Sequence, residues 1–159
     1  MSQFSVRRAR TDDWETIAEF NCRLAEESEN KQLSRERIEP GVRAVLADDS
    51  KGRYFLACDG ERIIGQLMHT FEWSDWRNGM IWWLQSVYVV PEFRRRGVFR
   101  RLYDFLRESA ESDPGVVGLR LYIEDGNERA LQTYLRSGMK QAGYFVMERL
   151  FIDVSNVPD

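Results

Sequence analysis

The segment from Met80 to Ser112 restricts the fold of this chain more than any other part of the sequence. Met80–Val90 is rich in aromatic and β-branched residues, which is typical of a β-strand. Pro91 ends this pattern, and the loop Glu92–Arg96 leads into Gly97–Ser112, where apolar residues recur at helical spacing. A strand that passes through a tight loop into an amphipathic helix predicts a mixed α/β fold.

A short strand and a helix are predicted before this segment, at the N-terminus. Phe4–Ala9 has the pattern of a strand. Thr11 or Asp12 can cap the helix that follows, with Glu15 placed to complete a capping box. The helical pattern ends in the polar stretch 26–32.

A second helix and a β-hairpin are predicted next. Ser34–Asp48 has a helical pattern that Pro40-Gly41 weakens or splits. Arg53–Cys58 and Glu61–Trp73 have strand patterns. Asp59-Gly60 between them is the strongest short hairpin signal in the chain.

The last third of the chain predicts strand, helix and strand. Val116–Ile123 carries few charges, so we expect a central strand that is buried on both faces. Asn127–Ser137 predicts a helix that begins at Asn127 as its N-cap and has Gly138 as its C-cap. Lys140–Phe151 predicts the final strand region.

Composition indicates one folded domain over residues 1–159, with a short polar tail at Ser155–Asp159. Hydrophobic residues make up 43% of the chain and aromatic residues 13%, enough to form a core and to exclude wholesale disorder. The mean hydropathy is −0.52, and no apolar run approaches the roughly 18 residues that would span a bilayer. The first residues show no apolar leader. We therefore expect a cytoplasmic protein without a membrane partner.

The cysteines and the single histidine do not indicate a metal site. Cys22 and Cys58 are too few for a disulfide framework or a zinc cluster, so we interpret them as inert thiols of a reducing compartment. His69 lies in a strand pattern and is predicted to line a pocket.

The loop after Pro91 predicts an anion-binding site. The first N–H groups of a helix lack intrahelical partners and lie at the positive end of its dipole. Six arginines and two acidic residues lie between Glu92 and Arg107, although the whole chain has a net charge of −3. A solvated basic helix face is the alternative. The phosphate-loop pattern GxxxxGK[ST] and the dinucleotide pattern GxGxxG are absent, and the acidic chain argues against nucleic acid as a partner.

Two motifs in this region and downstream resemble the GNAT superfamily of N-acetyltransferases. The first is Val89-x-Pro91-Glu92-Phe93-Arg94-x-x-Gly97, which is similar to the pyrophosphate motif of that family. The second is Asn127-x-x-Ala130-x-x-x-Tyr134-x-x-x-Gly138-Met139. The stretch 70–79 resembles the diamine or polyamine acetyltransferase branch. Phe99 stands where the motif has Gly or Ala, and Gln85-Ser86 stands where that branch has acidic residues.

The resemblance implies a GNAT-like fold that binds acetyl-CoA. Such a fold has a mixed, mostly antiparallel central sheet with about four helices, splayed between its fourth and fifth strands. The pantetheine arm would lie in the splay, hydrogen-bonded to Val87, Tyr88 and Val89 and bordered by Asn127 and Ala130. The loop residues that would hold the pyrophosphate, by backbone or side chain, are Arg94, Arg95, Arg96, Gly97, Val98, Phe99 and Arg100.

The resemblance also implies the reaction, in which a neutral amine of a small molecule or peptide attacks the thioester directly. Tyr134 would reach the sulfur and act as the acid for the departing thiolate. Family members often form homodimers, so a homodimer is expected.

The region before the long strand is our candidate for binding the acceptor amine. Four of the five tryptophans lie between positions 73 and 83. The candidate residues are Glu72, Trp73, Asp75, Trp76 and Gln85, since aromatic rings and carboxylates bind cations; Glu72 could also be the base. Core packing of Trp82 and Leu84 is an equally good interpretation of part of this region.

Two other functions remain open from the sequence. One is a non-catalytic acyl-CoA-binding module, in which Phe99 and Gln85-Ser86 mark lost chemistry. The other is a nucleic-acid-binding protein that uses the arginines of 94–107 and whose affinity would fall steeply with salt.

Overall fold

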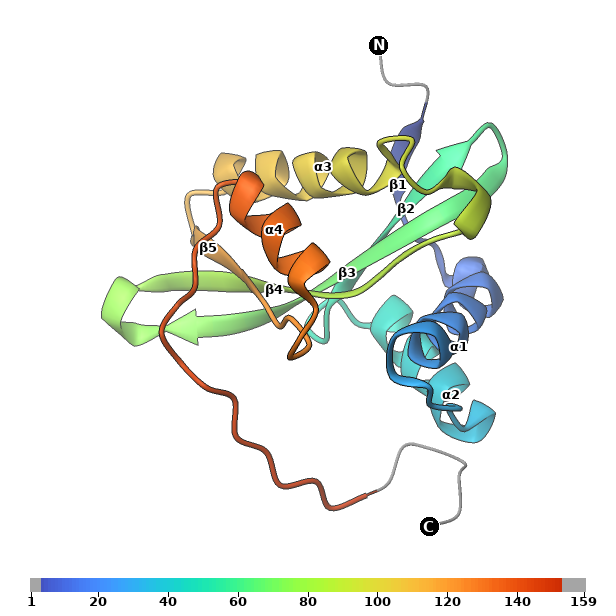
Figure 1. The fold of residues 1–159 in the computed structure, drawn as a ribbon, viewed down its shortest axis with the longest axis horizontal. Coiled ribbons are helices and arrows are strands. Elements are labelled where there is room, and N and C mark those ends of the chain that lie inside the picture. Colours follow the sequence, from blue (N-terminus) through green and yellow to red (C-terminus); the bar gives the residue numbers. More distant parts are fainter. Residues whose placement is uncertain (1–3, 153–159) are drawn as a thin grey trace.

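Five β-strands form one sheet in the order β1-β2-β3-β4-β5 (Figure 1). The computed structural model describes residues 4–152. The strands are β1 (Ser5–Arg8), β2 (Arg53–Asp59), β3 (Arg62–Ser74), β4 (Gly79–Val89) and β5 (Val116–Leu121). Strands β1 to β4 pair antiparallel, whereas β5 pairs parallel to β4. The predicted mixed, mostly antiparallel sheet is therefore confirmed.

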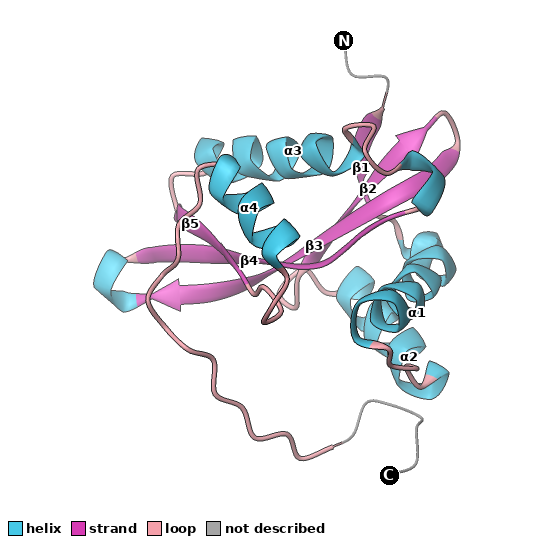
Figure 2. Ribbon diagram, viewed as in Figure 1, coloured by secondary structure: helices cyan, strands magenta, loops and turns pink. Residues whose placement is uncertain are grey.

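Two pairs of helices cover the sheet (Figure 2). The helices are α1 (Trp14–Glu29), α2 (Arg35–Ala47), α3 (Val98–Ser112) and α4 (Glu128–Arg136). Short 3-10 turns lie at Thr11–Asp13, Asp75–Arg77 and Pro91–Phe93. Neighbouring residues of a strand point to opposite faces: Met68 of β3 packs in a core cluster with residues of α1 and α2. Its neighbour His69 stacks on Phe55, which in turn contacts Phe105 of α3.

Several helices and strands begin or end where their turn and cap residues predicted. Asp59 pairs with Arg62 across the hairpin, and Gly60 takes a φ of 60° in the turn. Asn127 caps α4, because its Oδ1 accepts a hydrogen bond from the backbone N–H of Ala130 at 3.0 Å. Gly138, just after α4, has a φ of 92°, a conformation that glycine adopts without strain.

Both N-terminal helices differ from the prediction. Thr11 and Asp12 do not cap α1; instead Asp13 Oδ2 accepts a hydrogen bond from the Arg10 backbone N–H at 2.7 Å, and both carboxylate oxygens bind the Arg7 guanidinium. The predicted split at Pro40 is also wrong, because α2 runs through it without a break. A proline removes one backbone donor from a helix, and here the buried Val42, two residues further on, anchors the helix to the core.

The C-terminal part differs more. The double-sided burial predicted for Val116–Ile123 is wrong: β5 is the last strand of the sheet in the described residues, and Val117 is 43% exposed. The strand predicted at Lys140–Phe151 is also wrong. This segment is extended, exposed and outside the sheet (Figure 1). The polar tail predicted at Ser155–Asp159 lies outside the described residues.

The buried residues include one histidine and one thiol. His69 is fully buried between Phe55 and Trp82 rather than lining a pocket. Cys22 and Cys58 are both free.

None of the helices in residues 4–152 is long and apolar enough to cross a bilayer. Within the same residues, no cluster of three acidic, His or Cys side chains is arranged to hold a metal ion.

Candidate active site

Strands β4 and β5 separate part-way along their length. Their parallel pairing runs from Met80 opposite Val116 to Leu84 opposite Leu121. β4 continues to Val89, and there it pairs with β3 alone. The edge of β4 over Gln85–Val89 therefore faces a gap, which confirms the predicted splay and leaves backbone groups available to an extended ligand.

A β-bulge lies at the start of this open edge. Ser86 has a φ of 51°, and the register of β3 against β4 shifts between Gln66 and Met68. The fully buried Gln66 side chain donates to the Ser86 carbonyl at 3.1 Å and to Asn21 Oδ1 at 2.9 Å. Asn21 in turn donates to the Tyr54 hydroxyl at 3.0 Å. This buried network ties the bulge to α1.

Our sequence analysis missed the network that holds the bulge. The signal was the polar pair Gln85-Ser86 interrupting an apolar strand, together with the amide Gln66 inside the neighbouring apolar run. A buried amide must find partners, and a bulge supplies a carbonyl that a regular ladder would have used.

The loop between β4 and α3 turns its backbone outward at the same end of the sheet. Arg95 has a φ of 62° and Gly97 a φ of 85°, and both are exposed. No atom lies within 4 Å of the position that a Cβ on Gly97 would take, so the space over this residue is open. The N–H groups of residues 98–100 begin α3 and have no intrahelical partners. This arrangement fits an anion such as a diphosphate.

The arginines of the loop point in different directions. Arg94 donates from Nε to the Val89 carbonyl at 2.8 Å and from Nη2 to Glu27 of α1 at 2.5 Å. Arg96 lies over the ring of Phe93. Arg100 keeps 86% of its side-chain surface exposed, with Asp104 as its neighbour. Arg100 and the exposed Arg95 are therefore the side chains best placed for an anion at the start of α3.

Helix α4 brings Tyr134 against the first turns of α3. The Tyr134 ring lies edge-on to Phe99, with ring centroids 5.6 Å apart, and also contacts Tyr103. Burial, with a smaller effect of Tyr103, raises the pKa of Tyr134 to about 12. Tyr134 therefore stays protonated at neutral pH and is available as a donor. Asn127 and Ala130 begin the same helix.

Phe99 replaces the small residue of the family motif without closing the loop. Its ring is half-buried and turned toward Tyr103 and Tyr134. The aromatic side chain thus packs between α3 and α4, whereas the loop backbone at Gly97 stays open.

Part of the predicted acceptor site lies on the opposite face of the sheet from Tyr134. Glu72 Oε2 accepts hydrogen bonds from the Trp83 indole at 2.8 Å and from Arg120 at 2.9 Å. The Trp83 ring in turn contacts the ring of Tyr122. Gln85, two residues along β4 from Trp83, donates to the Thr70 hydroxyl at 2.7 Å. We call the residues Thr70, Glu72, Trp83, Gln85 and Arg120 the acceptor-side cluster.

The tryptophans do not form one site. Trp82 stacks on His69 at 4.1 Å in the core, and Leu84 is buried beside it, as the packing interpretation predicts. Trp73 follows Glu72 on the strand and so points to the other face. Asp75 and Trp76 lie in the turn at the end of the hairpin, where Trp76 is 87% exposed. Of the candidate acceptor residues, only Glu72 and Gln85 share the acceptor-side cluster.

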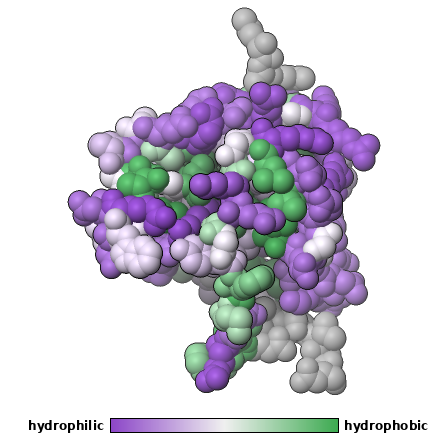
Figure 3. Space-filling view, turned by 60° about the vertical axis from the view of Figure 1, so that its left-hand side comes forward, coloured by the Kyte–Doolittle hydropathy of each residue, from purple (hydrophilic) through white to green (hydrophobic). Residues whose placement is uncertain are grey.

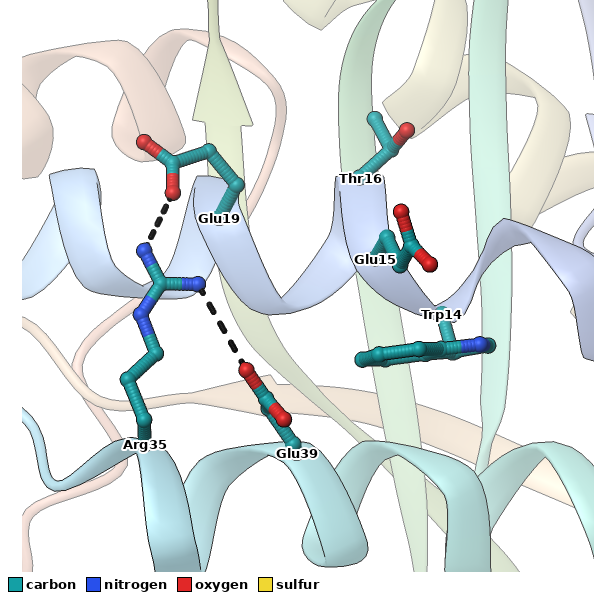
Figure 4. Close-up of a pocket in the computed structure, with 6 residues that line it drawn as sticks. All are labelled: Trp14, Glu15, Thr16, Glu19, Arg35 and Glu39. Carbon is teal, nitrogen blue, oxygen red and sulfur yellow. Dashed lines mark hydrogen bonds and ion pairs between the residues drawn. The ribbon is translucent and has the colours of Figure 1, made fainter.

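A hollow of about 450 Å³ lies elsewhere, between α1 and α2 (Figure 4). Its lining residues are Trp14, Glu15, Thr16, Glu19, Arg35 and Glu39. Arg35 bridges Glu19 and Glu39 across it. Because Arg35 neutralises two of its three glutamates and none of the candidate site residues lines it, we assign the site to the β4–β5 gap instead.

The sequence and the fold as a whole are similar to those of known proteins. The family model described as "Acetyltransferase (GNAT) family" matches residues 11–139. The chain belongs to this family. A crystal structure of a possible acetyltransferase from Clostridium difficile 630 is 41% identical, has a TM-score of 0.89, and aligns over 94% of this chain and 99% of that one.

Curated relatives have an activity in their names. The thialysine N-epsilon-acetyltransferase of Bos taurus is 27% identical over 150 residues, which are 87% of this chain and 85% of the relative. The protein of the same name from Caenorhabditis elegans is 34% identical over 80 residues, about half of each chain. The chain is thus a GNAT-fold acetyltransferase, as the two motifs predicted.

Proposed function

We propose that this protein transfers the acetyl group of acetyl-CoA to the primary amine of a small molecule or peptide while both are bound. The observation that carries the proposal is the open edge of β4 over Gln85–Val89, which is followed by the exposed loop that leads into α3. An extended ligand with an anionic end fits these two features together. The names of the relatives favour an acceptor with an aliphatic amine at the end of a side chain, as in thialysine.

Acetyl-CoA supplies the acetyl group, and different residues of the chain would bind its different parts. Backbone groups of Val87, Tyr88 and Val89 would bind the pantetheine arm, and one of their N–H groups would polarise the thioester carbonyl. The backbone of residues 95–100 would hold the diphosphate, with the side chains of Arg95 and Arg100. Arg94 would position the loop rather than bind the diphosphate, because Val89 and Glu27 hold its side chain and the Pro91 carbonyl accepts its backbone N–H. Asn127 and Ala130 would border the arm.

The acceptor amine would approach from the face opposite Tyr134. Glu72 and Gln85 would orient it, and the rings of Trp83 and Tyr122 would cover its aliphatic part. In the reaction a C–N bond forms and the C–S bond breaks. The surplus amine proton goes to water or a base, and the sulfur leaves with a proton donated by Tyr134. With a pKa of about 12, Tyr134 is protonated at neutral pH, so its hydroxyl can donate to the sulfur as negative charge develops there.

Two further parts of the proposal concern surroundings and partners. The free thiols Cys22 and Cys58 support a reducing, cytoplasmic location.

The arginines near α3 are spread over ion pairs with Glu27, Asp104 and Glu111 rather than gathered in one stripe. This distribution supports a small anionic ligand rather than nucleic acid.

A thiol-release assay with acetyl-CoA and a panel of amines tests the proposal. The panel is lysine, thialysine, diamines, polyamines and a lysine peptide, and at least one should release coenzyme A well above the hydrolysis rate. Tyr134→Phe should lower kcat about 100-fold, because general acid catalysis contributes about 10²–10⁴-fold. Tyr103→Phe is the matched control, since it removes a hydroxyl from the same aromatic cluster and should leave kcat within about twofold.

Three results would count against the proposal. Coenzyme A that raises the melting temperature without any acetyl transfer would indicate a binding module. Equal losses in the two tyrosine variants would remove the acid role from Tyr134. Binding of nucleic acid that coenzyme A does not compete with would point to the basic helix instead.

A further inference from the structure

The acceptor-side cluster holds a positive charge beside its negative one. Seen from the β3–β4 hairpin, the surface of the molecule is mostly hydrophilic, with smaller apolar areas (Figure 3). Arg120 of β5 donates from Nη1 to Glu72 Oε2 of β3 at 2.9 Å. The other members of the cluster, Thr70, Trp83 and Gln85, are uncharged, so its formal charges cancel. A cluster with one group of each sign fits a ligand that carries both signs itself.

The Arg120 guanidinium is held in place without being used up. A guanidinium carries its N–H donors in a planar fork, and within residues 4–152 the Arg120 side chain makes one hydrogen bond, to Glu72. The Arg120 side chain keeps 24% of its surface exposed and the Glu72 side chain 43%. The ion pair fixes the direction of the guanidinium, and its remaining donors can bind a carboxylate in a charge-assisted pair.

The distance from Arg120 to the open edge of β4 matches the length of an aliphatic amine side chain. Trp83 is opposite Thr70 on β3 and opposite Arg120 on β5, so the three residues lie in one row across the sheet. Gln85, where the open edge begins, is two residues further along β4, or about 7 Å. The side chain of lysine or thialysine is about as long as this. An acceptor lying along the Trp83 ring would therefore present its amine at Gln85 and its far end at Arg120.

The positive charge at this end disfavours an acceptor with two amines. The far ammonium of a diamine or polyamine would lie beside Arg120, and like charges repel at this range. Gln85 and Ser86, which stand where the polyamine branch has acidic residues, add no negative charge to offset the repulsion. A carboxylate at the far end would instead pair with Arg120. One group thus attracts one class of acceptor and repels the other, which is a common source of specificity.

We propose that Arg120 and Glu72 bind the α-carboxylate and the α-ammonium of a free amino acid, whose side-chain amine then accepts the acetyl group. Arg120 is a specificity-determining residue in this site. It selects amino acids over diamines, and over lysine inside a peptide, where both α-groups are uncharged amides. Arg120 lies outside both family motifs, and our sequence analysis did not include it among the candidates. The inference rests on the proposed function, because it names the acceptor of the same site.

Acceptors that differ in one group test the proposal on the unmodified protein. Cadaverine is lysine without its carboxylate, and lysinamide has a neutral amide in place of the carboxylate. In a thiol-release assay with acetyl-CoA, lysine should give a kcat/KM about 10- to 100-fold above either, because both lose the charge-assisted pair with Arg120. Cadaverine or lysinamide used as well as lysine would refute this inference and leave the proposed function intact. No transfer to any amine of the panel would refute the proposed function and this inference with it.

The variant Arg120→Gln tests whether the preference comes from this residue. It should lower kcat/KM for lysine about 10- to 100-fold, mostly through KM, and leave kcat/KM for cadaverine within about threefold or raise it. Arg107→Gln is the matched control, because Arg107 also pairs with a glutamate at 2.9 Å, on α3 and outside the acceptor-side cluster. The control should keep the preference for lysine.

Equal losses for lysine and cadaverine in Arg120→Gln would refute the role in specificity, because they would mean that the Arg120–Glu72 pair only joins β5 to β3. The melting temperature and the affinity for coenzyme A show whether the variant is folded. If it is not, the comparison of the three acceptors on the wild type still decides, since it needs no substitution.

Discussion

The two halves of β4 have different surroundings and, we infer, different tasks. Met80–Leu84 pairs with β3 on one side and β5 on the other, and its Trp82 and Leu84 are buried. Gln85–Val89 pairs with β3 alone and carries the bulge at Ser86. The first half has a strand on each side, whereas the second half has one edge without a strand partner, where Arg94 donates to the Val89 carbonyl.

The comparison separates stability from ligand binding along a single strand. Changes in the paired half should unfold the protein, and changes around the open half should weaken coenzyme A binding while the fold persists. The bulge is the boundary between the two, and the buried Gln66–Asn21 pair holds it in place.

The largest effect is expected in the paired half, for Trp82→Ala. Trp82 is 5% exposed and stacks on His69 at 4.1 Å. Truncating a buried aromatic side chain to Ala costs about 3–5 kcal/mol, which urea denaturation would measure. Trp76→Ala, at an exposed position, should cost little. If Trp82→Ala lost less than about 1 kcal/mol, our view of this half as the core of the sheet would be wrong.

The pH dependence of stability also tests whether the paired half of β4 forms the core of the sheet, because His69 is buried beside Trp82. Burial lowers the pKa of His69 from 6.5 to about 4. The unfolded chain takes up a proton near pH 6.5 and the native protein resists until about pH 4, so stability falls as the pH drops through this range. The expected loss is about 3 kcal/mol.

The variant His69→Phe isolates this effect from the titration of carboxylates such as Asp13, whose pKa Arg7 lowers. Denaturation curves of the two proteins at pH 7 and pH 4 should show that the free energy of unfolding falls less in the variant than in the wild type as the pH drops. Parallel pH profiles would show that the native protein protonates His69 as readily as the unfolded chain does.

A smaller effect is expected at the loop that ends the open half. Gly97→Ala meets no atom within 4 Å, but Ala at a φ of 85° is strained by about 1–2 kcal/mol. Relief of this strain should tilt the loop and weaken coenzyme A binding, as calorimetry would show. Gly41→Ala in α2 also meets no atom and has ordinary helical dihedrals, so it should be neutral or slightly stabilising. Equal coenzyme A affinities in the two variants would separate the loop from ligand binding.

The smallest effect is expected from Arg100→Ala. Because the side chain is exposed, folding should not change, but the dissociation constant for coenzyme A should rise about 3- to 10-fold at low salt and less at high salt. Arg107→Ala, further along α3 and paired with Glu111, is the control and should bind normally. A salt-independent loss, or the same loss in both variants, would contradict a direct contact with the diphosphate.

The sequence predicted those features that short-range chemistry decides. The hairpin at Asp59-Gly60, the cap at Asn127 and the start of α3 after Gly97 each depend on a few neighbouring residues. The GNAT fold and the splay followed from two motifs and were confirmed by the structure and the relatives.

Long-range contacts decided what the sequence did not show. The direction of Arg94 depends on Glu27, which is 67 residues away. The apolar pattern of Val116–Ile123 does not say that β5 lies at the edge of the sheet, because periodicity describes faces and not neighbouring strands. Lys140–Phe151 has the composition of a strand, but composition does not decide whether a neighbouring strand pairs with it, and in the structure it lies exposed outside the sheet.

Amide hydrogen exchange with and without coenzyme A, measured by mass spectrometry, tests the central claim most directly. We predict slower exchange on binding in peptides that contain Gln85–Val89 and Arg95–Arg100, with no change in Met80–Leu84, which is already paired on both sides. Protection confined to other regions, such as the hollow between α1 and α2, or no protection at saturating coenzyme A, would contradict the assignment of the open half of β4 as the binding edge.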